Sequence, residues 1–197
     1  MKLFQKGVGD TWKIFAEKIG AEYYKGGLIK NRRITVPVKK WQIVIDLNTV
    51  NNIPFTRVRC PFLSNSDFKL KIHRKSIFSF IAKLFGVRGI EIGFPEFDSK
   101  FLVKSNEVSM AMNLLSNSKI RELFLHISSL TLTFDLKKLR AGLGKKVPKN
   151  AKMLYFQEPS QIKDVDMLQN IVNLFREILM ELHRLSVVSD IAPDIKL

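Results

Sequence analysis

The chain has one cysteine, Cys60, among its 197 residues, which excludes an intrachain disulfide framework. Long apolar runs are also missing: the densest, from Ser76 to Val87, includes Lys83 and is shorter than the roughly 20 residues of a membrane-spanning helix. The N-terminal residues carry charge without the apolar core of a signal peptide. These absences favour a soluble protein with a cytoplasmic location.

Acidic side chains are scarce. The chain has 18 Asp and Glu against 33 Lys and Arg, which gives a formal net charge of +15. A field of this sign attracts polyanions, so the composition predicts the charge of a partner without identifying it.

Motifs for catalysis or metal binding are also lacking. His73, His126 and His183 have no second ligand at a metal-binding spacing, and Cys60 alternates with Val58 as a core residue would. The sequence Gly142 to Lys146 lacks the first glycine and the hydroxyl residue of a phosphate-binding loop. We therefore expect no metal and no cofactor.

The apolar periodicity predicts strands in runs and then helices. A first helix is expected after Asp10, and alternating strands surround the turns at Lys39-Lys40 and at Asn51-Asn52 with Pro54. Further strands are expected at these ranges: 55–60, 68–75, 90–94, 101–103, 130–136 and 153–157. Helices are expected from Ser76, from Ser105 or Asn106 with a restart at 116–118, and from Asp164.

This order indicates an α+β fold rather than alternating βαβ units. We expect an antiparallel sheet that starts as a meander, with helices on one face and a long C-terminal helix. The chain is expected to form one domain, with a possible subdivision near residues 86–89.

The positive charge is concentrated in two segments. In the first, Arg57 to Arg88, strand alternation places Arg57, Arg59, Lys69 and Lys71 on a solvent face, together with Phe55. A basic sheet face with an exposed aromatic residue is typical of proteins that bind single-stranded nucleic acid. The commoner reason for such a pattern is solubility and protection of the sheet edge.

The second segment, Lys137 to Lys152, has seven basic residues and no acidic one. It includes Lys137, Lys138, Arg140, Lys145 and Lys146, which can neutralise phosphates or simply remain solvated.

Three alternatives stay open. Glu91, Glu96 and Asp98 form an acidic cluster that would suit acid–base chemistry, although pairing with nearby lysines is the simpler interpretation. The long C-terminal helix would suit an interaction or scaffold module. The apolar segment from Ser76 has some features of an interfacial membrane helix, but its polar face is thin.

Three stretches carry a family resemblance. From Glu91 to Leu115, a strand start with Phe97 and Phe101 precedes Val103-Lys104-Ser105 and a helix. Together with Trp41 to Asp46 and Lys83 to Gly86, this order resembles a family of bacterial proteins of unknown function. The resemblance implies a bacterial origin and an α+β domain, and it implies no activity or catalytic residue.

The first hypothesis is therefore a non-enzymatic domain that binds an anionic partner through its basic sheet face and the 137–152 segment. Nucleic acid is the expected polyanion, followed by phospholipid headgroups or an acidic protein.

Overall fold

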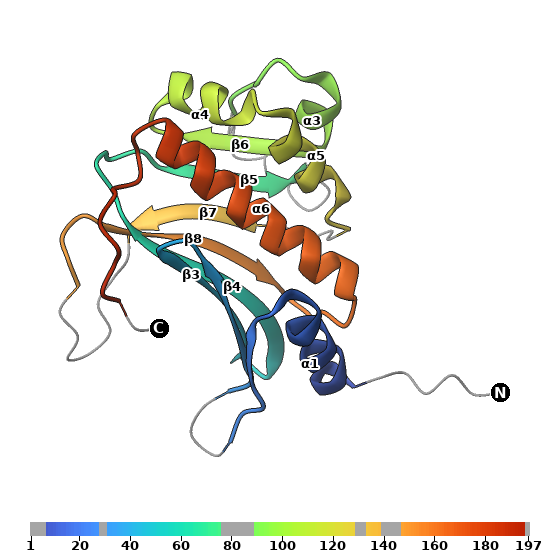
Figure 1. The fold of residues 1–197 in the computed structure, drawn as a ribbon. Helices are drawn as coiled ribbons and strands as arrows, with labels where there is room; N and C mark the ends of the chain where they lie inside the picture. Colours follow the sequence, from blue (N-terminus) through green and yellow to red (C-terminus); the bar gives the residue numbers. More distant parts are fainter. Residues whose placement is uncertain (1–6, 28–30, 76–88, 129–132, 139–146, 196–197) are drawn as a thin grey trace.

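A single antiparallel sheet of eight strands organises the protein (Figure 1). The structure is a computed structural model, and it describes residues 7–27, 31–75, 89–128, 133–138 and 147–195. The strands are β1 (Glu22–Tyr24), β2 (Arg33–Val38), β3 (Trp41–Val50), β4 (Ile53–Leu63), β5 (Leu70–Arg74), β6 (Phe101–Ser105), β7 (Thr133–Lys138) and β8 (Ala151–Glu158). Their order across the sheet is β1-β2-β3-β4-β8-β7-β5-β6.

The helices in the described ranges are α1 (Val8–Ile19), α3 (Pro95–Lys100), α4 (Val108–Leu115), α5 (Ser118–His126) and α6 (Val165–Arg184). With the antiparallel sheet they make a mixed α+β fold, as the sequence predicts. The predicted cap of the long C-terminal helix is confirmed, because the Asp164 side chain accepts hydrogen bonds from the backbone N–H groups of Asp166 and Met167.

The core lies between the helices and one face of the sheet. Alternate residues of each strand point into it, for example Val58 and Cys60 of β4 and Ile72 of β5. The apolar stripe of α6 faces the same core: Leu168, Ile171, Val172, Phe175, Ile178, Leu179 and Leu182. Burying each of these side chains contributes roughly 1.5–3 kcal/mol to stability. Packing against the core of the same chain is therefore enough to hold α6 in place.

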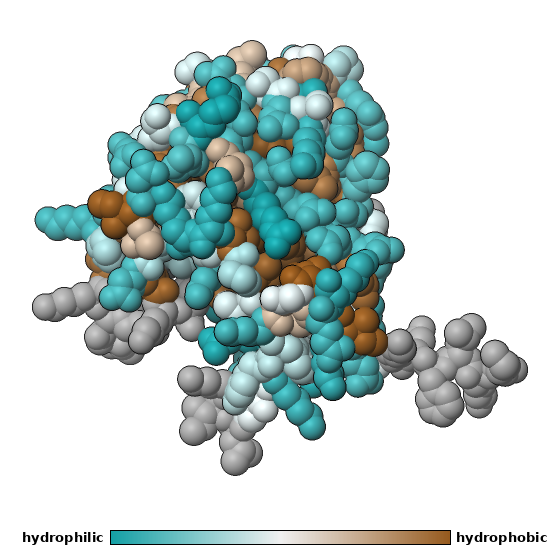
Figure 2. Space-filling view, in the orientation of Figure 1, coloured by the Kyte–Doolittle hydropathy of each residue, from teal (hydrophilic) through white to brown (hydrophobic). Residues whose placement is uncertain are grey.

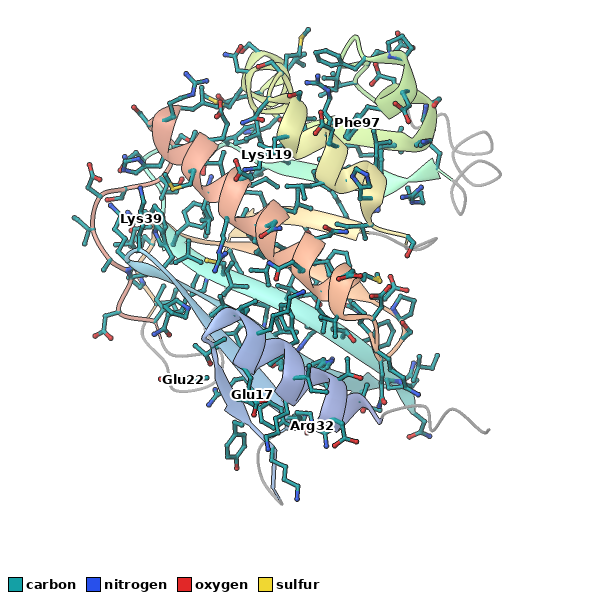
Figure 3. The ribbon with its side chains drawn as sticks, turned by 45° about the vertical axis from the view of Figure 1, so that its right-hand side comes forward. Glu17, Glu22, Arg32, Lys39, Phe97 and Lys119 are labelled. Atoms are coloured by element: carbon teal, nitrogen blue, oxygen red, sulfur yellow. The ribbon has the colours of Figure 1, made fainter. Side chains whose placement is uncertain are left out.

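The helices also contact one another over the sheet. Lys119 of α5 reaches Glu177 of α6, with 2.6 Å between Nζ and Oε1 (Figure 3). Phe97 of α3 stacks on Phe101, with ring centroids 4.7 Å apart, and meets Phe124 edge-on. On this side, Figure 2 shows a mainly hydrophilic surface with hydrophobic atoms in separate small patches.

The sheet order corrects one expectation. The sequence predicts a meander in which β5 follows β4 as its neighbour, but β4 pairs with β8, and β7 pairs with both β8 and β5. The segment 64–69 therefore crosses three strand spacings, about 14 Å at 4.8 Å each. Six residues can span roughly 20 Å, so this connection is long enough.

The strand expected at 90–94 is also wrong. Ile90 forms an isolated bridge with Val103. The backbone N–H groups that follow donate to a side chain instead of to a neighbouring strand. The carboxylate of Asp98 accepts hydrogen bonds from the backbone N–H groups of Ile92, Gly93 and Phe94 at 2.8–3.0 Å. Gly93 has a φ of 87°, which breaks the extended conformation.

Three smaller expectations need correction. Gly7 rather than Asp10 is the N-cap of α1, and Asp10 lies exposed in the first helical turn, where its charge favours the helix dipole. Pro54, expected in a turn, lies within β4 close to its start. Glu107 occupies the N-cap of α4, while the Ser105 hydroxyl accepts from its backbone N–H at 3.0 Å.

Some predictions lie outside the described residues, including the helix expected from Ser76 and most of the 86–89 division. The strands before and after that division belong to one sheet. Among the described residues, no helix combines the length and the apolar composition needed to cross a bilayer.

Candidate nucleic-acid interface

The sheet face that points away from the core is called the outer face here. The strand registers place one row of residues directly side by side across it, in the order Val44, Arg59, Tyr155, Asp135, Lys71 and Lys104. The next row runs from Asp46 through Arg57 and Gln157, and continues across β7 to His73 and Leu102. Six strands thus contribute to one outer face, which is mainly polar, although Val44, Asp46 and His73 are themselves buried.

Asp46 organises the β3–β4 part of this surface. Its carboxylate accepts two hydrogen bonds from Arg57, at 2.9 Å from both Nε and Nη2, and one from Nη2 of Arg59 at 2.5 Å. The three side chains are 10%, 23% and 17% exposed for Asp46, Arg57 and Arg59. One carboxylate therefore holds two guanidinium groups in fixed positions and leaves a surplus positive charge.

Arg59 is the less compensated of the two arginines. Its Nε atom is buried and has no hydrogen-bond partner among the described residues. Burial lowers the pKa of Arg59, although the charge of Asp46 acts in the opposite direction. An arginine remains protonated under these conditions, and Arg59 shares its one carboxylate with Arg57, so its buried charge lowers stability unless a further anion approaches it.

Lys71 and Lys104 form the cationic end of the first row. They are directly opposite each other on β5 and β6, and both side chains are exposed. Like charges in this position destabilise a strand pair, by up to about 1 kcal/mol. His73, on the same face of β5, is 8% exposed, and its pKa is lowered to about 4 by burial and then by Lys71 and Lys104.

Tyr155 occupies the middle of the row, between Arg59 and Asp135. Its ring is half-buried, and its hydroxyl donates a hydrogen bond to Oε1 of Gln157. Burial raises the pKa of Tyr155, so the phenol is uncharged at neutral pH. Phe55 lies further along the same face of β4 and is also half-buried.

The structure places the predicted site residues unequally. Arg57, Arg59 and Lys71 share the outer face, and Lys69 is exposed directly before β5. Lys137 and Lys138 lie on β7, but their side chains are outside the description. Arg140, Lys145 and Lys146 lie outside the described residues altogether.

Sequence reasoning missed Lys104 and Tyr155. Both could have been assigned to a solvent face from alternation with inward neighbours, Val103 for the lysine and Leu154 and Phe156 for the tyrosine. No sequence signal shows that β8 lies beside β4, so the position of Tyr155 next to Arg59 depends on the tertiary fold.

The acidic cluster has structural contacts. Asp98 holds the turn described above, and Glu96 forms an ion pair with Lys100, with 2.9 Å between Oε1 and Nζ. Glu91 is exposed. Cys60 is fully buried, and this burial raises the pKa of its thiol.

Comparison with known proteins gives no further guidance: no family model, no curated protein sequence and no solved structure matches this chain. The interpretation of the outer face therefore rests on its geometry.

Proposed function

We propose that this protein binds single-stranded nucleic acid on the outer face of its sheet. The observation that carries the proposal is the row in which Arg59, Tyr155, Lys71 and Lys104 lie in register across β4, β8, β5 and β6. It brings cations and an aromatic ring to one surface, and such surfaces bind the phosphates and the bases of a single strand.

The spacing of the row suits this ligand. Arg59 and Lys71 are three strands apart, about 14 Å, and Tyr155 lies between them at one strand spacing from Arg59. A base can stack on Tyr155 while phosphates on either side approach Arg59 and the pair of lysines. Stacking tolerates any base, so we expect little sequence preference.

The charge of the surface supports the same proposal. From β3 to β6, the described outer-face side chains, with Lys69 at the edge, include five cations (Arg57, Arg59, Lys69, Lys71, Lys104) and two carboxylates (Asp46, Asp135). An anionic strand would offset the repulsion between Lys71 and Lys104, and its binding would release counterions.

Fluorescence anisotropy with a labelled single strand of about 12 nucleotides tests the proposal at about 50 and about 200 mM salt. The key variant is Lys71→Ala with Lys104→Ala, and its matched control is Lys13→Ala with Lys18→Ala on α1. Each contact between a lysine and a phosphate contributes about 0.7 to the slope of log K against log salt. The slope should therefore fall by about 1.4 in the outer-face variant and stay unchanged in the control.

Stacking is tested at Tyr155. Tyr155→Leu should weaken binding by about 1–3 kcal/mol, whereas Tyr155→Phe keeps the ring and most of the affinity. The proposal is wrong if the protein does not bind the strand at low salt, or if the two double-lysine variants behave alike. Binding to anionic vesicles without binding to the oligonucleotide would assign the face to a lipid surface instead.

A further inference from the structure

A second feature, independent of the outer face, is the buried lysine at the start of β8. Lys152 lies on the inner side of the sheet, opposite Phe62 of β4, and only 4% of the residue is exposed. Its Nζ donates a hydrogen bond to the backbone carbonyl of Phe68 at 2.7 Å. A lysine is rarely buried to this extent without an ion-pair partner.

The amine of Lys152 is poorly compensated. An ammonium group has three hydrogens to donate, and the Phe68 carbonyl is the one acceptor found for it among the described residues. Within the same residues it forms no ion pair with a carboxylate. Burial lowers the pKa of Lys152; the charges of Asp67 and Glu107 act in the opposite direction, and the charge of Lys69 lowers the pKa further. The neutral, nucleophilic amine is therefore more populated than in an exposed lysine.

Lys152 also lines a surface hollow. The hollow has a volume of about 350 Å³ and lies between the 64–67 connection and the 149–152 segment. This volume is within the range of roughly 300–1,000 Å³ that is usual for small-molecule sites. Asn150 fixes one wall by donating from Nδ2 to the carbonyl of Ser64 at 3.3 Å, and Asn65 donates from Nδ2 to the carbonyl of Ser186 at the same distance.

The charges around the hollow indicate the kind of ligand. Asp67 also lines it, so an anionic group on its side of the hollow would meet a carboxylate. Lys149, which is exposed and lines the same hollow, can attract an anionic group of the ligand. A carbonyl compound with a phosphate or carboxylate substituent satisfies both conditions.

We propose that Lys152 forms an imine with small aldehydes or ketones that enter this hollow. The lone pair of Nζ attacks the carbonyl carbon, and the carbonyl oxygen leaves as water with the two hydrogens of the amine. The new C=N bond replaces C=O, so the step needs no oxidant or reductant. Asp67 lines the same hollow and is the carboxylate there that can exchange protons with the reacting groups.

The test uses the full chain and pyridoxal 5′-phosphate, which carries one aldehyde and one phosphate. The imine is reduced with sodium borohydride, and peptide mass spectrometry compares the label at Lys152 with that at Lys149. These lysines lie three residues apart, so one peptide contains both the site and its exposed control. Because burial lowers the pKa of Lys152, more of its amine is neutral and able to attack the aldehyde at neutral pH.

We expect Lys152 to carry several times more label than Lys149, and to reach its maximal labelling rate at a lower pH. The fast adduct should disappear in Lys152→Met and persist in Lys149→Met. Equal or weaker labelling of Lys152, or labelling only in denaturant, would show that the lysine is purely structural. If Lys152→Met does not fold, the ratio within the wild-type peptide decides by itself.

Discussion

Replacing Asp46 with asparagine tests the charge arrangement of the outer face most directly. The substitution preserves the volume of the side chain and removes its charge, which leaves Arg57 and Arg59 side by side without a carboxylate. Removing one partner of a buried ion pair costs about 3–5 kcal/mol. Because these side chains are 10–23% exposed, solvent screening reduces the expected loss to about 2–3 kcal/mol.

Urea unfolding at pH 7 measures this loss. With a denaturant slope of about 2–3 kcal/mol/M for a chain of this size, the midpoint should fall by about 1 M. The exposed pair formed by Glu96 and Lys100 provides the control, since Glu96→Gln should change stability by less than about 0.5 kcal/mol.

A second substitution makes the argument sharper. Arg59 has a buried Nε without a partner among the described residues, so in the Asp46→Asn protein it is the most unfavourable charge. Arg59→Met should therefore recover about 1–2 kcal/mol in that background, while it changes the wild-type protein little. If Arg59→Met lowers the stability of the wild-type and the Asp46→Asn proteins equally, the uncompensated charge of Arg59 is not the cause of the loss in Asp46→Asn.

Two further predictions concern single groups. The pKa of His73 is about 4 in the folded protein against 6.5 for the unfolded chain. Between these pH values the unfolded state binds more protons than the folded state. The free energy of unfolding should therefore fall as the pH drops from about 6.5 to about 4. Between pH 7.5 and pH 5 this loss should be about 1–2 kcal/mol after allowance for screening, and it should vanish in His73→Gln, as urea titrations at both pH values would show. Asp98→Ala leaves the N–H groups of Ile92, Gly93 and Phe94 without their acceptor, so the free energy of unfolding should fall by about 1–3 kcal/mol; a loss no greater than that of Glu96→Gln would contradict this role.

The sequence predicted correctly those strands and helices whose periodicity, turns and caps all lie within one short segment. The alternation around Lys39-Lys40 correctly gave β2 and β3, and the Asp164 cap with its apolar stripe gave α6. The strand at 90–94 failed because a side chain six residues away from Ile92 takes the backbone donors. A period of two identifies an apolar face, but it does not show where the partner of each N–H group will be.

The position of the β7–β8 hairpin could not be predicted for a related reason. Alternation assigns an inner and an outer face to each strand, and it is equally satisfied whether β5 lies beside β4 or beyond β7 and β8. The insertion changes the candidate site, because it brings Tyr155 next to Arg59 and separates the arginines from Lys71. Asp46 was likewise missed, since its contact with both arginines depends on the β3–β4 register.

The structure also limits how much of the net charge a nucleic acid can use. Arg57 and Arg59 share one carboxylate, and Lys152 is buried on the inner side, so these cations are not equivalent to exposed ones. The exposed lysines of the described outer face are Lys69, Lys71 and Lys104. If each neutralises one phosphate, they predict a salt slope of about 2 for a single strand. A measured slope well above this value would mean that further cations contact the strand, either Arg57 and Arg59 or the basic residues between 139 and 146. The slope of Arg59→Met and that of a variant with Arg140, Lys145 and Lys146 neutralised would distinguish these two sources.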